Sequence, residues 1–217
     1  MKLCKAILLL IGLAMIAALV ACSSGSGSST TPPPTIAISA TGGTPQSTAV
    51  GTAFGTQLQA TVTSNGSPDS GATVTFVAPS QGASCTFANN TNTATTNSSG
   101  QALITCTANT EAGGPYNVTA STTGATASAT FSLTNTAGAA ADLSISSGNG
   151  QFVSPGSTYA PLVAEVTDTD GNPVQGVAIT FTATAGTSGA SGTFTSTSSG
   201  TETQTTGTNG LPPLATS

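Results

Sequence analysis

The 217-residue sequence contains no histidine and no tryptophan, and its only cationic side chains are Lys2 and Lys5. Without this N-terminal segment, seven carboxylates remain and no positive side chain pairs with them. Binding to a phosphate backbone requires Lys or Arg, so DNA and RNA are excluded as partners. His, Lys and Arg also supply most general bases, amine nucleophiles and oxyanion clamps. The composition therefore predicts a protein that is not an enzyme and needs no cofactor.

The N-terminus has the layout of a secretory signal peptide. Both lysines precede an uncharged apolar stretch, residues 6–21. This stretch is short for a membrane-spanning helix, which needs about 20 residues. We therefore expect residues 1–21 to act as a signal peptide that is removed on export.

The end of this segment, Leu19-Val20-Ala21-Cys22, resembles the lipobox of bacterial lipoproteins. The resemblance implies that Cys22 is lipidated and becomes the first residue of the mature chain; an ordinary signal peptide with a chance cysteine is the alternative. Two acyl chains satisfy the requirement for stable anchoring in a membrane. Ser23 stands where an Asp would indicate inner-membrane retention in that family, so the outer membrane or cell surface is the expected location.

Residues 22–34 have the composition of a tether, with Gly and Ser first and three prolines at the end. After the tether, apolar and polar residues alternate with period two, which predicts half-buried β-strands at residues 58–63, 72–76, 116–120 and 125–134. Richness in Ser, Thr and Gly would favour disorder as the alternative. Nine aromatic residues lie on or beside the strand-like runs and are expected in the core: Phe54, Phe76, Phe87, Tyr116, Phe131, Phe152, Tyr159, Phe181 and Phe194.

An internal repeat divides the rest of the chain into two units, residues 35–137 and 138–217, with residues 134–140 as the joint. Residues 65–76 match residues 170–181 at an offset of 105, and residues 82–87 and 97–100 match residues 189–194 and 207–210. The repeated Asn/Asp-Gly turns and the Gly-Pro-Tyr-Asn-Val-Thr-Ala run at residues 114–120 resemble the group 1 bacterial immunoglobulin-like domains of invasin and intimin. The resemblance implies antiparallel Greek-key β-sandwiches strung in series at the cell surface. Most copies in that family are spacers, and binding is confined to particular units.

Cys85 and Cys106 are expected to form a disulfide. In the repeat they align with Gly192 and Thr216, so the second unit lacks both, as a bonded pair predicts. Export to an oxidising compartment permits the bond. Two buried free thiols are the alternative, and a metal site from two cysteines without histidine is less favoured.

The second unit is expected to lack its last two strands, because it stops one residue past the position equivalent to Cys106, whereas the first unit continues for about 30 residues. Truncation of a longer reading frame is the plain explanation. The alternative is a partner that donates the missing strand.

Asp168, Asp170 and Asn172 form the only acidic cluster in the sequence. The spacing fails the EF-hand template, since Gly171 is at the fourth position and Ile179 stands where the bidentate Glu belongs. Asp-Gly and Asn are also what a tight hairpin requires. Turn chemistry is therefore the preferred interpretation, a weak cation loop is the alternative, and no other metal site is expected.

The sequence thus predicts a lipid-anchored stalk or spacer of tandem immunoglobulin-like sandwiches in the cell envelope. The alternative is an adhesin or binding module that contacts a surface protein or a glycan. A non-catalytic arm of an exported enzyme is a third hypothesis. Beyond the membrane that holds the lipid anchor, no residue identifies a partner.

Overall fold

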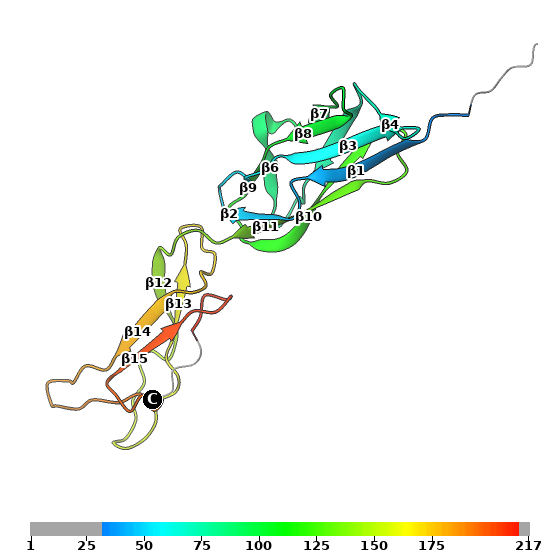
Figure 1. Ribbon diagram of the computed structural model, residues 1–217. Coiled ribbons are helices and arrows are strands. Elements are labelled where there is room, and N and C mark those ends of the chain that lie inside the picture. Colours follow the sequence, from blue (N-terminus) through cyan, green and yellow to red (C-terminus); the bar gives the residue numbers. More distant parts are fainter. Residues whose placement is uncertain (1–31, 213–217) are drawn as a thin grey trace, which may run out of the picture. The chain divides into compact units, whose positions relative to one another are not determined.

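The computed structural model describes residues 32–212, and the described part of the chain is built from β-strands with one 3₁₀ turn, Ala88–Asn90. The all-β fold class predicted from the period-two pattern is confirmed. The strands form two immunoglobulin-like sandwiches, β1 to β11 and β12 to β15 (Figure 1). Both belong to one compact unit of the chain that begins at Pro34. Among the described residues, no helix is long and apolar enough to cross a membrane.

The first sheet of the first sandwich is centred on β3 (Leu58–Ser64). This strand pairs antiparallel with β1 (Ile36–Gly42), β4 (Ser67–Pro68) and β8 (Gln101–Ile104). Leu58, Ala60 and Val62 are fully buried, and the residues between them are only partly buried. The alternation seen in the sequence therefore turns every second side chain of β3 into the core.

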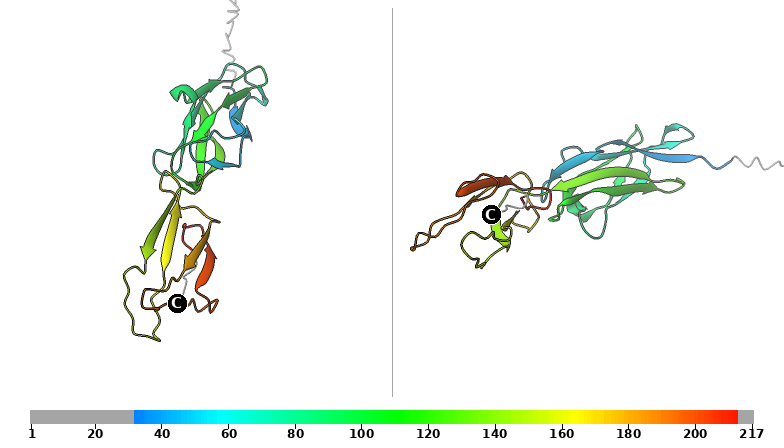
Figure 2. Two further views of the ribbon diagram at one scale, coloured as in Figure 1. Left: turned by 90° about the vertical axis from the view of Figure 1, so that its left-hand side faces the viewer. Right: turned by 90° about the horizontal axis from the view of Figure 1, so that it is seen from below.

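The second sheet has the order β2 (Gln46–Ala49), β11 (Ala129–Thr136), β10 (Gly113–Thr122), β5 (Thr73–Val77) and β7 (Thr93–Thr95). All neighbours are antiparallel except β2 and β11, which are parallel. Its buried side chains complete the core against β3 and β8, and Figure 2 shows the sandwich from two further sides. Phe76 and Phe131 lie in van der Waals reach with ring centroids 6.0 Å apart, and burial of each contributes about 1.5–3 kcal/mol to stability.

A short antiparallel pair, β6 (Cys85–Phe87) and β9 (Cys106–Ala108), closes one end of the first sandwich. A single residue separates β9 from β8, so the chain leaves the sheet that contains β3 and enters this pair almost at once.

The second sandwich consists of two strand pairs. β12 (Asp142–Ser147) pairs with β13 (Val163–Thr167), and β14 (Ala178–Thr182) pairs with β15 (Thr201–Thr205). Its core cluster consists of Ala164, Val166 and Ile179, with further apolar side chains packed around them, and Val163 and Phe194 are buried as well.

The second core is smaller because one edge of it has no covering strand among the described residues. In the first sandwich β5 lies between β7 and β10, whereas the equivalent β14 pairs with β15 only. On β12, Leu143 is 64% and Ile145 68% exposed, although Ile36 and Ile38 of β1 are packed against the first core.

Three details differ from the sequence expectations. The strand expected at residues 125–134 begins at Ala129, because Gly124 has φ +87° and Ala125 N–H closes a turn to the Thr122 carbonyl. The joint expected at residues 134–140 is shorter, because β11 continues to Thr136.

Two aromatic residues expected in the core are exposed instead, Phe152 at 98% and Tyr159 at 40%. Both lie in the Gly-, Ser- and Pro-containing segment between β12 and β13, which forms no strand that could turn their rings inward.

Candidate functional site

Cys85 and Cys106 form a disulfide, with Cα atoms 5.7 Å apart and a sequence separation of 21 residues. The pair is possible because β6 and β9 are antiparallel neighbours, in which Phe87 lies opposite Cys106. Both cysteines are buried. Closing a loop of this length stabilises the first sandwich by about 3 kcal/mol in the chain-entropy model.

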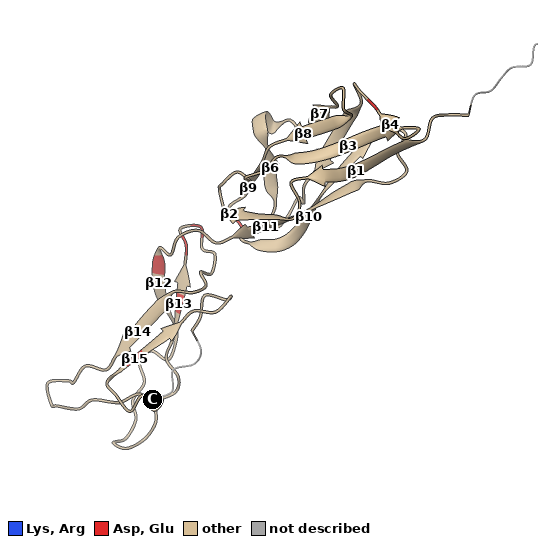
Figure 3. Cartoon of the chain, in the orientation of Figure 1, with Lys and Arg blue, Asp and Glu red and all other residues tan. Residues whose placement is uncertain are grey.

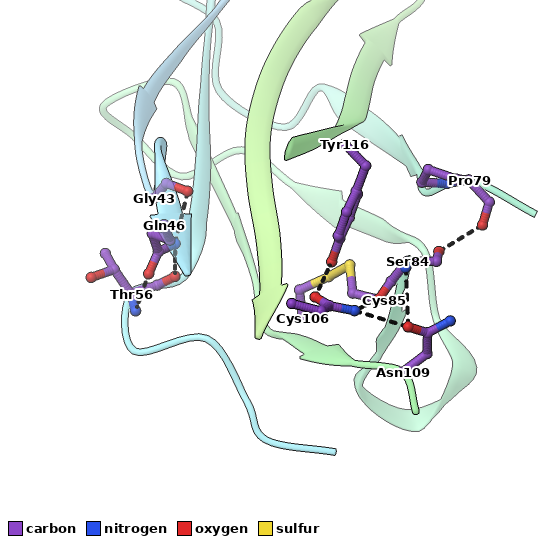
Figure 4. Close-up of a disulfide and its surroundings, with 10 residues drawn as sticks. Gly43, Gln46, Thr56, Pro79, Ser84, Cys85, Cys106, Asn109 and Tyr116 are labelled. Atoms are coloured by element: carbon purple, nitrogen blue, oxygen red, sulfur yellow. Dashed lines mark hydrogen bonds between the residues drawn. A yellow bond between two sulfur atoms is a disulfide. The ribbon is translucent and has the colours of Figure 1, made fainter. Parts of the chain in front are cut away.

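A buried polar network lies beside the disulfide (Figure 4). Its centre is Asn135 of β11, which is only 2% exposed. The Asn135 Nδ2 group donates to the carbonyl of Ser84 at 2.9 Å, to Asn109 Oδ1 at 2.8 Å and to the carbonyl of Glu111 at 3.1 Å. These bonds fix the loop between β9 and β10, because Asn109 Oδ1 also accepts the Ser84 N–H at 3.1 Å.

Tyr116 completes this network from β10. Its hydroxyl donates to Asn135 Oδ1 at 2.9 Å. Burial raises the pKa of Tyr116 to about 12, although its hydrogen bond to Asn135 acts in the opposite direction. Tyr116 is therefore a neutral structural residue at every physiological pH.

The acidic cluster forms a tight turn after β13, and Asp168 holds it together. Asp168 is 2% exposed, and its Oδ1 accepts the backbone N–H groups of Asp170 at 3.0 Å and Asn172 at 2.8 Å. Its Oδ2 accepts the N–H of Gly138 at 2.8 Å and Nδ2 of Asn172 at 2.9 Å. Burial alone would raise the pKa of Asp168, but the hydrogen bonds from Asn172, Gly138 and Asp170 outweigh it and lower the pKa below its ordinary value.

In this geometry the acidic cluster is a tight turn. The carboxylate of Asp168 is occupied by protein donors, and Asp170 is exposed. Within residues 32–212, no group of three or more His, Cys, Asp or Glu side chains could hold a metal ion. The candidate lipidation site, Cys22, lies outside the described residues.

The turn also contacts the first sandwich through Asn172. Its Nδ2 donates to the Thr110 carbonyl at 2.9 Å, and its Oδ1 accepts the Ala112 N–H at 2.8 Å. Sequence reasoning did not find this contact, since Asn172 looked like an ordinary turn residue and its partners are backbone atoms about 60 positions away.

Each sandwich contains a glutamine clamp, a glutamine side chain that bonds to the backbone of two other residues. The sequence did not predict it. Gln46 donates to the carbonyls of Gly43 and Thr56, at 2.7 and 2.8 Å, and accepts the Thr56 N–H at 2.8 Å. Gln151 makes the same three bonds with Gly148 and Ala160. The two glutamines are 105 residues apart, the offset of the repeat, and that coincidence is the signal that would have found them.

A second set of hydrogen bonds also occurs in both sandwiches, and in each it is made by a threonine hydroxyl with two backbone groups of an earlier loop. Thr96 Oγ1 donates to the Asp69 carbonyl and accepts the Ala72 N–H, and Thr206 Oγ1 does the same with Val174 and Val177. The repeat seen in the sequence is therefore a repeat of hydrogen bonds as well.

The remaining candidates are one buried carboxylate and one hollow, both in the second sandwich. Glu202 of β15 is 4% exposed; its Oε1 accepts Nε2 of Gln204, and its Oε2 has no hydrogen-bond partner. The hollow has a volume of about 420 Å³ and is lined in part by Tyr159, Phe181 and Phe194. Phe181 and Phe194 form a tilted ring pair, as Phe76 and Phe87 do in the first sandwich, where Phe131 of β11 adds a third ring. The hollow is thus the part of the core that β11 fills in the first copy.

The acidic side chains of the described residues are scattered over strands and turns, and no Lys or Arg lies among them (Figure 3). The side chains therefore form no ion pairs there. Charge does not single out a binding face.

No family model matches the chain, and no curated protein matches it. Similar solved structures include the Escherichia coli adhesin FdeC (19% identity, 84% of this chain and 54% of that chain, TM-score 0.40) and the D0-D1 domain of intimin (21%, 82% and 82%, 0.32). A third is invasin, described as a bacterial integrin-binding protein (22%, 81% and 34%, 0.32). The chain spans about half the length of the FdeC structure. At TM-scores below 0.5, these likenesses carry no assignment of function.

Proposed function

We propose that the protein is a lipid-anchored cell-envelope protein whose immunoglobulin-like sandwiches act as a structural stalk or spacer. The observation that carries this proposal is the repetition of the same internal hydrogen bonds in both sandwiches, at Gln46 and Gln151 and at Thr96 and Thr206. The second copy therefore repeats a scaffold. The carboxylate of its distinctive polar cluster, Asp168, makes its hydrogen bonds within the chain.

The chemistry of the described residues agrees with a mechanical role. The buried polar side chains Asn135 and Asp168 have their hydrogen-bonding groups occupied by the protein, and the two cysteines near Asn135 are joined to each other. Groups used in this way rigidify a scaffold.

The anchor in this proposal is Cys22, in the lipobox-like sequence that ends the leader. Acylation there would attach the sandwiches through the Ser/Gly/Pro tether to the outer membrane or cell surface. This part of the proposal rests on the sequence.

One experiment tests anchor and spacer together. Cells expressing the chain with a C-terminal epitope are labelled with an alkyne fatty acid, and energy transfer is measured from the epitope to a membrane dye. The Cys22→Ala variant should lose the label and the membrane fraction. Insertion of a second copy of residues 35–137 should move the epitope away from the dye. Acylation of Cys22→Ala at the wild-type level would overturn the anchor, and unchanged energy transfer on insertion would overturn the spacer.

A binding role is the second candidate, and the exposed ring of Phe152 favours it. The neighbouring Gln151 occupies the position of Gln46, so Phe152 stands where the first sandwich has an exposed Ser47. Aromatic residues, Phe among them, are enriched in protein interfaces relative to the rest of the surface. If the chain is an adhesin, Phe152→Ala should reduce attachment of expressing cells to a surface protein or glycan, and the matched Ser47→Ala variant should not. Equal attachment by both variants would remove this candidate.

A further inference from the structure

The contact between the sandwiches brings three separate segments together. These are the loop between β9 and β10, the linker after β11 and the turn after β13. Asn172 of the turn bonds to Thr110 and Ala112 of the loop, and Asp168 of the same turn accepts the Gly138 N–H of the linker at 2.8 Å. The linker is tied once more where the Ala141 N–H donates to the Thr167 carbonyl at 2.9 Å.

The carboxamide of Asn172 is held in one orientation. A carboxylate only accepts hydrogen bonds, so the Nδ2 group must be the end that faces Asp168 Oδ2 at 2.9 Å. The same end then donates to the Thr110 carbonyl, which leaves Oδ1 for the Ala112 N–H. Asp168 therefore positions Asn172 to meet one acceptor and one donor two residues apart.

The receiving loop is also rigid. The Glu111 carbonyl, between the two contact residues, accepts Nδ2 of the buried Asn135 at 3.1 Å, and the adjoining Asn109 is bonded to the same side chain. The Thr110 carbonyl and the Ala112 N–H thus form a fixed socket, defined by these two backbone groups.

The first sandwich provides an internal comparison, because the equivalent turn there has different residues and different partners. There the equivalent segment is Asn65-Gly66-Ser67, in which Ser67 stands at the place of Asn172. Asn65 Oδ1 accepts the Thr35 N–H at 2.9 Å from the chain just before β1. The pair of Asp and Asn therefore occurs at the turn that contacts another sandwich, and the equivalent turn of the first sandwich lacks it.

We propose that Asp168 and Asn172 form a connector whose partner is the backbone socket at the end of a preceding sandwich, and that this pair couples the two sandwiches into one body. Asn172 binds the loop at the end of an immunoglobulin-like unit of the same kind. It recognises a carbonyl and an N–H group of that loop that lie two residues apart. The proposal concerns how the units are joined, and it holds whether the whole protein spaces or binds.

The test uses the full chain, labelled with ¹⁵N, in detergent micelles. In the wild type, ¹⁵N relaxation should report a common rotational correlation time for the two sandwiches. Asn172→Ala should give them separate correlation times and should raise hydrogen exchange at the Ala112 N–H about fivefold or more, the factor for loss of one ordinary hydrogen bond. The matched control is Thr169→Ala, which changes an exposed residue of the same turn and should leave both readouts unchanged.

Folding of the variant is checked at the Val166 N–H, which donates to the Gly210 carbonyl inside the second sandwich. If that amide stays protected and the two correlation times remain common, the connector is overturned. If Asn172→Ala unfolds the second sandwich, Ala112→Pro takes its place, since it removes the socket's donor and leaves the turn intact. Separate correlation times in Ala112→Pro would support the connector, and a common one would overturn it. Because no cell is involved, failure here is distinct from failure of the spacer experiment.

Discussion

Glu202 is a buried acidic side chain in a region of the chain that has no cation to pair with it. Its Oε2 has no hydrogen-bond partner, and Phe181 lies opposite it across the β14–β15 ladder. A buried carboxylate without compensation opposes folding strongly. We therefore expect Glu202→Gln, which keeps the shape and removes the charge, to stabilise the protein at pH 7 by about 1–3 kcal/mol. Thermal or urea unfolding of the full chain measures the change.

The control for this variant is Asp142→Asn, which removes a carboxylate from an exposed position on β12. An exposed substitution of this kind should change stability by no more than about 0.5 kcal/mol. If Glu202→Gln is as stable as the wild type or less stable, the carboxylate is not a source of instability, and its charge is compensated in solution.

For single residues, the sequence predicted a role where a residue belongs to a periodic pattern or to a pair. It did not predict a role for residues whose side chains bond to distant backbone groups. Cys85 and Cys106 could be paired because the second copy lacks both. Asn135 and Asn172 could not be singled out, because asparagine is common in turns and linkers. Their partners are backbone groups of other loops, which leave no trace in residue type.

At the scale of elements, alternation predicted β3 and β5 to within one residue, because each has one face in the first core. It predicted only the middle of β10, which begins three residues earlier and ends two residues later than expected. It failed for the start of β11, where Ala, Thr and Ser alternate without a large apolar side chain. Such a pattern does not distinguish a strand from a turn. It failed again for Phe152, since placing an aromatic residue in the core requires a strand to carry it, and the segment between β12 and β13 has none.

The repeat was the most informative element-scale signal. Residues that the repeat aligns make the same hydrogen bonds in both copies, at Gln46 and Gln151 and at Thr96 and Thr206. The same comparison explains the hollow beside Phe181 and Phe194, because β10 and β11 cover the matching face in the first sandwich. The offset could not predict the contacts at the joint between the sandwiches, because the two copies differ there.

For the whole molecule, the shifted pKa values of Asp168 and Tyr116 predict a loss of stability at each extreme of pH. The pKa of Asp168 is lowered from an ordinary value of 3.8, so its contribution is present in full above pH 3.8 and is lost as the pH falls through the lower, folded value. The groups that donate to this carboxylate belong to Gly138, Asp170 and Asn172. Of these only Asp170 carries a charge, and its contact is through the backbone N–H. Acid should therefore loosen the joint first, seen as faster exchange of the Gly138 N–H.

The alkaline limit comes from Tyr116, whose pKa is raised from 10.0 to about 12. A raised pKa means that the neutral phenol is favoured in the folded state, so its contribution is complete below pH 10 and is lost between pH 10 and 12. Urea unfolding of the full chain from pH 3 to pH 11 should give a plateau with a decline at each end, and absorbance at 295 nm reports the phenolate directly. Tyr116→Phe should lower the plateau by about 1 kcal/mol, because it removes one hydrogen bond, and should weaken the alkaline decline. Asp168→Asn should flatten the acid decline instead. An alkaline decline that is identical in the wild type and in Tyr116→Phe would show that Asn135 and Tyr116 do not set this limit.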